Sequence, residues 1–282
     1  MKNTSPLRRG LLAASVSALA IGSMLGMSTQ ALAQAKIPMR ISTPAVPDDW
    51  HAKMWTVFKD ALDKSSPNQF DTQINLNASL FKQGTEPAAM ARGNLELSAI
   101  SAFDMAKLVP EFSIFTAGYV VRDPAHQQKV FNGPIGEGLF KSVSEKMDVT
   151  VLSTAYLGTR QVNLREARNV KTPADLKGIK WRSYSPSTAR IAELVGAQPV
   201  TVQAAEFSQA LATGVVESTM TSGATGVDSK LYEHLKYYYD VQAWLPKNAV
   251  IANKKAFDAL DKPTQDALLK AAAAAETRGW TE

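Results

Sequence analysis

Cysteine is absent from the 282-residue chain. Disulfide bonds, thiolate nucleophiles and cysteine-ligated zinc sites are therefore excluded. Histidine is scarce, and the three copies, His51, His126 and His234, are far apart and form no metal-binding pair. The chain also lacks a G-x-S-x-G nucleophile elbow, a Walker loop and a G-x-G-x-x-G motif. The sequence thus offers no catalytic motif, and we expect neither enzymatic activity nor a bound cofactor or metal.

A strong excess of one charge is missing as well. The chain has 31 Lys and Arg against 26 Asp and Glu, a net charge of +5. Three of the basic residues (Lys2, Arg8 and Arg9) lie among the first 33, where no acidic residue occurs, so residues 34–282 carry 28 against 26, a net of +2. This balance gives no indication of nucleic-acid binding. With 45% hydrophobic and 20% charged residues, the composition is that of a globular protein and not a disordered one.

Long hydrophobic runs are confined to the beginning of the chain. There the basic residues precede an apolar run of small residues, Leu11–Met27, and Ala31-Leu32-Ala33 matches the A-x-A pattern of signal-peptidase sites. We predict a signal peptide over residues 1–33, cleaved after Ala33, with cleavage after Ala35 as the alternative. An uncleaved membrane anchor is disfavoured, because the run is rich in small residues. The remaining chain is expected to be a soluble periplasmic protein.

Short β-rich runs alternate with helical patterns through residues 34–282. The predicted strands are Met39–Ser42, Phe70–Leu76, Leu97–Ile100, Val149–Ala155 and Ile179–Ser183; the predicted helices are Trp50–Ser65, Glu86–Arg92, Phe103–Val109, Gly136–Met147 and Thr264–Trp280. The glycine-rich segment Gly133–Gly138 predicts a turn. Such βα alternation favours parallel or mixed sheets covered by helices. About 249 residues fit two α/β lobes, with a ligand crevice at the carboxyl ends of the strands.

The most informative stretch of sequence runs from Tyr156 to Gly223. It contains Gly158-Thr159-Arg160, then Pro173-Ala174-Asp175-Leu176-Lys177-Gly178-Ile179-Lys180-Trp181-Arg182, Gly196-Ala197-Gln198-Pro199-Val200 and Glu206-Phe207-Ser208-Gln209-Ala210-Leu211-Ala212-Thr213-Gly214-Val215-Val216-Glu217. This ordered series closely resembles the DctP-type solute-binding proteins of tripartite ATP-independent periplasmic (TRAP) transporters. The resemblance extends over nearly all of residues 34–282.

The resemblance implies a two-lobed α/β periplasmic-binding-protein fold, with a ligand cleft between the lobes and hinge closure. We expect the solute-binding domain at residues 34–282 and its second lobe mainly at about 155–245. Family members usually continue beyond the helix that Thr264 begins, so we expect a shortened or incomplete C-terminal part. The implied partners are a small organic acid and the integral-membrane permease subunits that receive it, and we expect a monomer.

The resemblance also implies which side chains bind the ligand. Arg182 matches the family arginine that pairs with the ligand carboxylate, and we expect an unliganded cleft to leave its guanidinium exposed to water. Arg160 matches a second family arginine, and a structural ion pair is the alternative role. Thr221 stands where the family often has a ligand-binding asparagine, so a hydroxyl replaces an amide. Glu86 and the aromatic residues Phe103, Tyr184 and Trp244 complete the predicted set.

The loss of that amide, together with the aromatic residues, favours a monocarboxylate with an apolar, aromatic or keto body over dicarboxylates or sialic acid. Two other functions remain open at this point. One is a secreted hydrolase or lyase on a similar fold, and the other is a sensor-type binding protein that serves a signalling partner.

Overall fold

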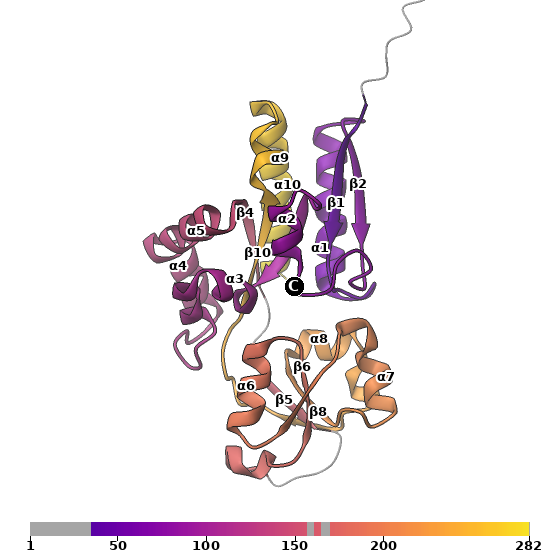
Figure 1. Cartoon of the computed structure of the whole chain (residues 1–282), viewed down its shortest axis with the longest axis vertical. Helices are drawn as coiled ribbons and strands as arrows, with labels where there is room; N and C mark the ends of the chain where they lie inside the picture. Colours follow the sequence, from indigo (N-terminus) through magenta and orange to yellow (C-terminus); the bar gives the residue numbers. More distant parts are fainter. Residues whose placement is uncertain (1–34, 157–160, 165–169, 282) are drawn as a thin grey trace, which may run out of the picture. The chain divides into compact units, whose positions relative to one another are not determined.

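The computed structural model describes residues 35–156, 161–164 and 170–281, and Lys36–Glu282 form one compact unit. This unit contains two mixed five-stranded sheets, each packed against helices (Figure 1). The prediction of an α/β protein with mixed sheets is thereby confirmed. Within the described ranges, no helix combines the length and the apolar composition that a membrane span requires.

The first sheet has the strand order β2-β1-β3-β10-β4. Its strands are β1 (Ile37–Ser42), β2 (Phe70–Asn75), β3 (Leu97–Ser101), β4 (Val149–Tyr156) and β10 (Lys247–Asn253). Strand β1 pairs in parallel with β2 and β3, whereas β10 is antiparallel to both β3 and β4. The sheet is mixed because the chain completes the second sheet before it returns as β10.

Helices cover both faces of the first sheet. They are α1 (Trp50–Ser65), α2 (Glu86–Ala91), α3 (Ala102–Leu108), α4 (Pro124–Phe131), α5 (Pro134–Met147), α9 (Lys254–Asp258) and α10 (Lys262–Thr281), with a 3₁₀ helix η1 (Pro110–Phe115). Successive residues of β10 point to opposite faces, so Val250 belongs to the core under α1 and α10, and Ile251 to the core under α3 and α5. Strand β10 is buried on both sides, and its continuous apolar run Ala249–Ala252 reflects this.

The second sheet has the strand order β7-β6-β8-β5-β9. Its strands are β5 (Gln161–Leu164), β6 (Lys180–Ser183), β7 (Gln198–Thr201), β8 (Ser218–Thr221) and β9 (Tyr237–Tyr239). The accompanying helices are α6 (Pro186–Leu194), α7 (Phe207–Ala212) and α8 (Gly223–Asp228), with 3₁₀ helices η2 (Pro173–Leu176), η3 (Ala204–Glu206) and η4 (Leu231–Glu233). Trp181 lies at the centre of this lobe, almost completely buried beside Leu164 and Ile179. It therefore serves as a core residue.

One local prediction is wrong. The segment Gly133–Gly138 is not a turn, because α5 begins at Pro134 and continues through both later glycines. Proline is favoured in the first helical turn, where its missing N–H costs nothing. A Cβ at Gly136 would lie 2.0 Å from the carbonyl oxygen of Phe131, so glycine is required there by close packing and not by turn geometry.

Candidate ligand-binding site

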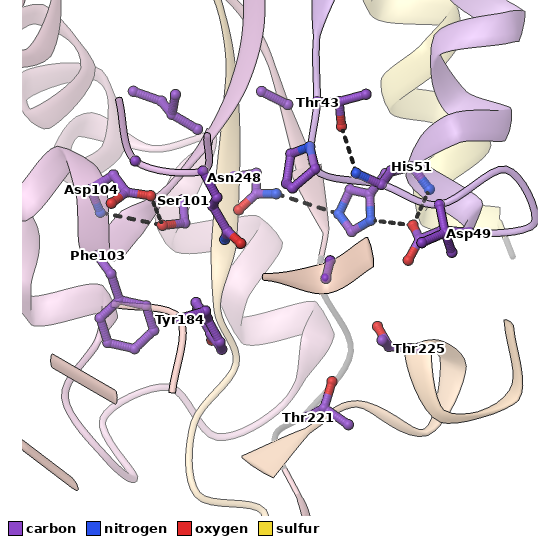
Figure 2. Close-up of a pocket in the computed structure, with 18 of the residues that line it drawn as sticks. Thr43, Asp49, His51, Ser101, Phe103, Asp104, Tyr184, Thr221, Thr225 and Asn248 are labelled. Atoms are coloured by element: carbon purple, nitrogen blue, oxygen red, sulfur yellow. Dashed lines mark hydrogen bonds and ion pairs between the residues drawn. The ribbon is translucent and has the colours of Figure 1, made fainter. Parts of the chain in front are cut away.

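A cavity of about 130 Å³ is lined by residues of both sheets and their helices. The first sheet and its helices contribute, among others, Thr43, Asp49, His51, Glu86, Ser101, Phe103, Asp104 and Asn248, and the second contributes Arg182, Tyr184, Phe207, Thr221 and Thr225 (Figure 2). Several of these residues stand where parallel strands end and helices begin. Open α/β sheets bind ligands at such positions.

Arg182 lies on β6, between β7 and β8, and reaches the cavity from the second lobe. Its Nε donates a hydrogen bond of 3.1 Å to the Val202 carbonyl oxygen. The guanidinium carbon lies 5.1 Å from the ring centre of Tyr184 and 4.7 Å from that of Phe207, within the range of cation–π attraction. These contacts hold the planar group in one orientation, which suits recognition of a planar carboxylate.

The expectation that the Arg182 guanidinium would be exposed to water is wrong. Arg182 is only 8% exposed, because Tyr184 and Phe207 contact its charged group. Burial removes the shielding effect of water, so a carboxylate that enters this site interacts with the charge more strongly than at the surface. The same contacts mean that removal of the side chain would disturb packing as well as charge.

Aromatic rings form one wall of the cavity. Phe103, near the beginning of α3, lies edge-on to Tyr184 with a centroid distance of 6.4 Å. Trp244 lies edge-on to Phe103 at 5.8 Å and is 5% exposed, but it is not among the residues that line the cavity. The structure thus brings the first two rings to the cavity and places Trp244 behind Phe103 as support.

The other predicted site residues have different positions. Thr221, the last residue of β8, lines the cavity and is 5% exposed. Glu86 lines it at the start of α2. Arg160 lies outside the described residues, so its predicted role stays a prediction.

Glu86 is a buried carboxyl group, 2% exposed, whose Oε2 accepts a hydrogen bond of 2.7 Å from the Gly84 backbone N–H. Burial raises the pKa of the Glu86 carboxyl to about 7, and the nearby Asp104 raises it further, against the lowering effect of the backbone N–H donors. Near neutral pH the cavity therefore contains a carboxyl group that can carry a proton. Such a group can either donate or accept a hydrogen bond.

We expect Glu86 to make the stability of the protein fall as the pH rises. Between pH 4.5 and about 7 an unfolded chain has released this proton while the folded protein retains it, so the free energy of unfolding falls as the pH rises across that interval. From pH 5 to 8 the free energy of unfolding should fall by about 2–3 kcal/mol. Glu86→Gln should abolish this fall. Urea unfolding of both proteins at several pH values measures this. Glu145→Gln, at an exposed carboxyl on α5, controls for net charge; equal pH profiles for wild type and Glu86→Gln would contradict the prediction.

Asp49, His51 and Asn248 are among the cavity residues that were not predicted from the sequence as site residues. Asp49 is the N-cap of α1, where it accepts the backbone N–H of His51 at 2.8 Å. The same Oδ1 atom lies 2.7 Å from Nδ1 of the buried His51 ring, and Nε2 of that ring lies 3.4 Å from Nδ2 of Asn248. Asn248 comes from a distant part of the chain, so no local sequence pattern groups the three residues.

The two lobes also contact each other through Asp228. The Asp228 carboxylate, at the end of α8, accepts a hydrogen bond of 2.9 Å from the backbone N–H of Trp50, the first residue of α1. Lys53 lies 3.9 Å from the same carboxylate. An acidic group at a helix N-terminus is electrostatically favourable. This contact stabilises the arrangement in which residues of both lobes surround the cavity.

The cavity lining combines charged and polar side chains with apolar and aromatic ones. Among the described residues, no group of three or more His, Asp or Glu side chains is placed to hold a metal ion. The Asp49–His51 pair has the orientation of a base and its supporting carboxylate in a hydrolase, but its Nε2 faces an amide and not a nucleophilic hydroxyl. Arg182 on the second lobe can bind a carboxylate, and polar side chains of the first lobe can form hydrogen bonds. This combination suits a small organic acid.

Several known proteins are similar to this chain. An extracytoplasmic solute receptor of Bordetella pertussis that binds pyroglutamic acid is 39% identical, covers 87% of this chain and 80% of its own, and superposes with a TM-score of 0.80. A TRAP periplasmic solute-binding protein of Roseobacter denitrificans, with bound 3-deoxy-D-manno-oct-2-ulosonic acid, is 35% identical with the same TM-score, covering 87% and 81%. The C4-dicarboxylate-binding periplasmic protein of Rhodobacter capsulatus is 28% identical over 270 residues, which are 95% of this chain and 79% of that protein.

The family assignment follows from the whole domain and not from one motif. The DctP model, described as bacterial extracellular solute-binding protein, family 7, matches residues 42–282. That range includes both sheets except for the first residues of β1, and every described residue that lines the cavity. This chain belongs to family 7 of the bacterial extracellular solute-binding proteins, the DctP family of TRAP transporters.

Proposed function

We propose that this protein is the periplasmic solute-binding component of a TRAP transporter, that it captures a small monocarboxylic acid, and that it delivers this acid to membrane permease subunits. The observation that carries the proposal is Arg182, a buried guanidinium held between Tyr184 and Phe207 at the cavity. A guanidinium held in one orientation presents a planar set of N–H donors that matches the geometry of a carboxylate. We infer that the ligand carboxylate binds to it.

Two features favour a compact acid over a large sugar acid or a dicarboxylate. The cavity volume of about 130 Å³ is below the range usual for drug-sized ligands and corresponds to roughly four water molecules. The buried carboxyl groups of Glu86 and Asp104 line the same cavity, and in their ionised forms they disfavour a second carboxylate. Pyroglutamic acid, the ligand of the Bordetella receptor, is a monocarboxylate with a small ring and is our first candidate.

Ligand capture would proceed by closure of the two lobes. A ligand that contacts Arg182 on one lobe and Phe103 on the other makes its full set of contacts only when the lobes approach. Binding therefore shifts the population toward the closed state by the free energy of those additional contacts. The hydrogen bond between Asp228 and Trp50 would stabilise the same closed state. Closure presents the permease with a surface that differs between loaded and empty protein.

The proposed location is the periplasm, with export directed by residues 1–33. Relatives of this chain are extracytoplasmic receptors, which supports the proposal. An intact-mass measurement on the exported protein tests it and should give a chain that begins near Gln34. A membrane-retained chain that still begins at Met1 would contradict it.

The ligand proposal is tested by thermal unfolding and calorimetric titration with L-pyroglutamate, benzoate, pyruvate, succinate and 3-deoxy-D-manno-oct-2-ulosonic acid. A ligand at a hundred times its Kd stabilises the folded state by about 2.7 kcal/mol, which raises the Tm by roughly 5–10 °C for a domain of this size. We expect such a rise with L-pyroglutamate and a smaller one with succinate or the eight-carbon sugar acid. If only those two acids raise the Tm, a compact monocarboxylate is not the ligand.

The same samples distinguish a binding protein from a hydrolase or lyase. After prolonged incubation, the NMR spectrum of a bound acid should be unchanged, because the cavity binds without breaking a bond. Accumulation of a product in proportion to protein and time would support the enzymatic alternative.

A further inference from the structure

The Asp49–His51 pair determines which atoms of the neighbouring groups can donate hydrogen bonds. A carboxylate only accepts, so the 2.7 Å contact with Asp49 Oδ1 requires the proton on Nδ1 of His51. The other ring nitrogen, Nε2, faces the amide nitrogen of Asn248 at 3.4 Å. An amide NH₂ only donates, so in this arrangement Nε2 is the acceptor and the ring proton lies on Nδ1.

This tautomer orients the amide of Asn248. With Nδ2 directed at the imidazole, the Oδ1 atom lies on the side of the amide away from His51 (Figure 2). Asn248 is near the start of β10 and lines the cavity. Its Oδ1 is buried, and within the described part of the chain it has no hydrogen-bond partner. A buried acceptor without a donor destabilises a folded protein by about 1–3 kcal/mol, and a donor on a bound ligand would remove this cost.

The neighbouring side chain cannot supply that donor. In the antiparallel ladder Asn248 stands directly opposite Ser101 on β3. The single hydroxyl hydrogen of Ser101 is donated to Asp104 Oδ2 at 2.7 Å, and the Ser101 oxygen accepts the backbone N–H of Asp104. Asp104 in turn pairs with Lys107 at 2.8 Å. The hydroxyl hydrogen of Ser101 is therefore already used within the first lobe.

We propose that Asn248 is a specificity-determining residue whose Oδ1 accepts a hydrogen bond from an N–H or O–H group of the ligand, and that His51 is the positioning residue which keeps this oxygen turned away from the imidazole. The inference rests on the proposed function, since it assumes that a small acid occupies the cavity. It adds a second requirement to that acid: besides the carboxylate for Arg182, the ligand carries a hydrogen-bond donor. A lactam N–H or a 2-hydroxyl group has this chemistry.

Pairs of acids that differ only in the hydrogen-bond donor measure its contribution to affinity. L-Pyroglutamate is compared with its lactone analogue, 5-oxotetrahydrofuran-2-carboxylate, in which a ring oxygen replaces the N–H. Mandelate is compared with phenylacetate, which lacks the hydroxyl group. In each pair both members have a carboxylate, so the ratio of their Kd values reports the donor and not the Arg182 contact. For the wild type we expect the donor-bearing member of at least one pair to bind at least tenfold more tightly, which is 1.4 kcal/mol.

Three variants test whether this preference depends on Asn248 Oδ1 and on the His51 ring. Asn248→Leu has a similar volume without the acceptor, and the ratio should fall to within about twofold of one. Asn248→Asp keeps an oxygen acceptor, so the preference for the donor should persist even if both members bind more weakly. His51→Phe leaves Asn248 in place but removes the group that orients it, and the ratio should fall as well. Circular dichroism and the Tm of each variant without ligand establish that it is folded.

The outcomes separate the two proposals. A wild-type ratio near one, or a preference that persists in Asn248→Leu, overturns the role of Asn248 while the binding of acids stands. A preference that survives in His51→Phe overturns the positioning role of His51. If none of the four acids binds the wild type, the proposed capture of compact monocarboxylates fails and this inference fails with it.

Discussion

Replacing Arg182 by alanine is expected to weaken binding of the ligand acid by about 2–5 kcal/mol, a loss of roughly 30-fold to several thousand-fold in affinity. The reason is the environment of the guanidinium, which is 8% exposed and oriented by Val202, Tyr184 and Phe207. Among the described residues that line the cavity, Arg182 is the single Arg or Lys, and Glu86 and Asp104 contribute carboxyl groups, so its removal takes away an attractive charge for the ligand carboxylate. Calorimetric titration of L-pyroglutamate, or of the acid that the thermal screen identifies, measures the loss.

The packing of Arg182 requires a control for folding. Alanine leaves a space between two aromatic rings, so a lower Tm is expected for Arg182→Ala in addition to weak binding. Arg182→Lys retains the positive charge and most of the volume but loses the planar pair of donors, and it should also bind poorly. A folded Arg182→Ala protein whose Kd is within threefold of the wild type would show that the carboxylate is held elsewhere.

Replacing Gly136 by alanine should destabilise the protein by about 3 kcal/mol or more, which lowers the Tm by roughly 6–12 °C. The added Cβ would lie 2.0 Å from the carbonyl oxygen of Phe131 and 2.6 Å from its carbonyl carbon. These are backbone atoms at the end of α4, so no flexible side chain can move away. The connection between α4 and α5 would have to shift, and Phe131, which is stacked on Phe115 at 4.0 Å, would move with it.

Gly138 offers a matched control two residues further along the same helix. It is exposed, and a Cβ there meets nothing within 4 Å. Alanine has a higher helix propensity than glycine, so Gly138→Ala should stabilise the protein by about 0.5–1 kcal/mol. Thermal unfolding of the two variants should give shifts of opposite sign. A Gly136→Ala protein as stable as the wild type would mean that α4 and α5 pack less closely than the structure indicates.

The helices and strands were predictable because their signals are local. Trp50–Ser65 was predicted as a helix with the bounds that the structure has. Phe70–Leu76 was predicted as a strand from alternating polar and apolar residues, and the structure has a strand at Phe70–Asn75. Each pattern reflects one face of one element buried against the rest of the protein. The prediction failed at Gly133–Gly138, because a cluster of glycines does not by itself distinguish a turn from a helix start that passes close to the preceding helix, as Gly136 does at the Phe131 carbonyl.

The sequence by itself therefore determined the α/β class, the family and the candidate arginine on β6, because contiguous residues carry periodicity and motif. Only the tertiary structure decided that Arg182 is buried between two rings, that Trp244 stands behind Phe103, and that His51 contacts Asn248 across a separation of 197 residues. Such contacts depend on the register of β10 against β3 and on how the two lobes meet at the cavity. No short segment encodes that register, since it is set by the simultaneous packing of both faces of the sheet.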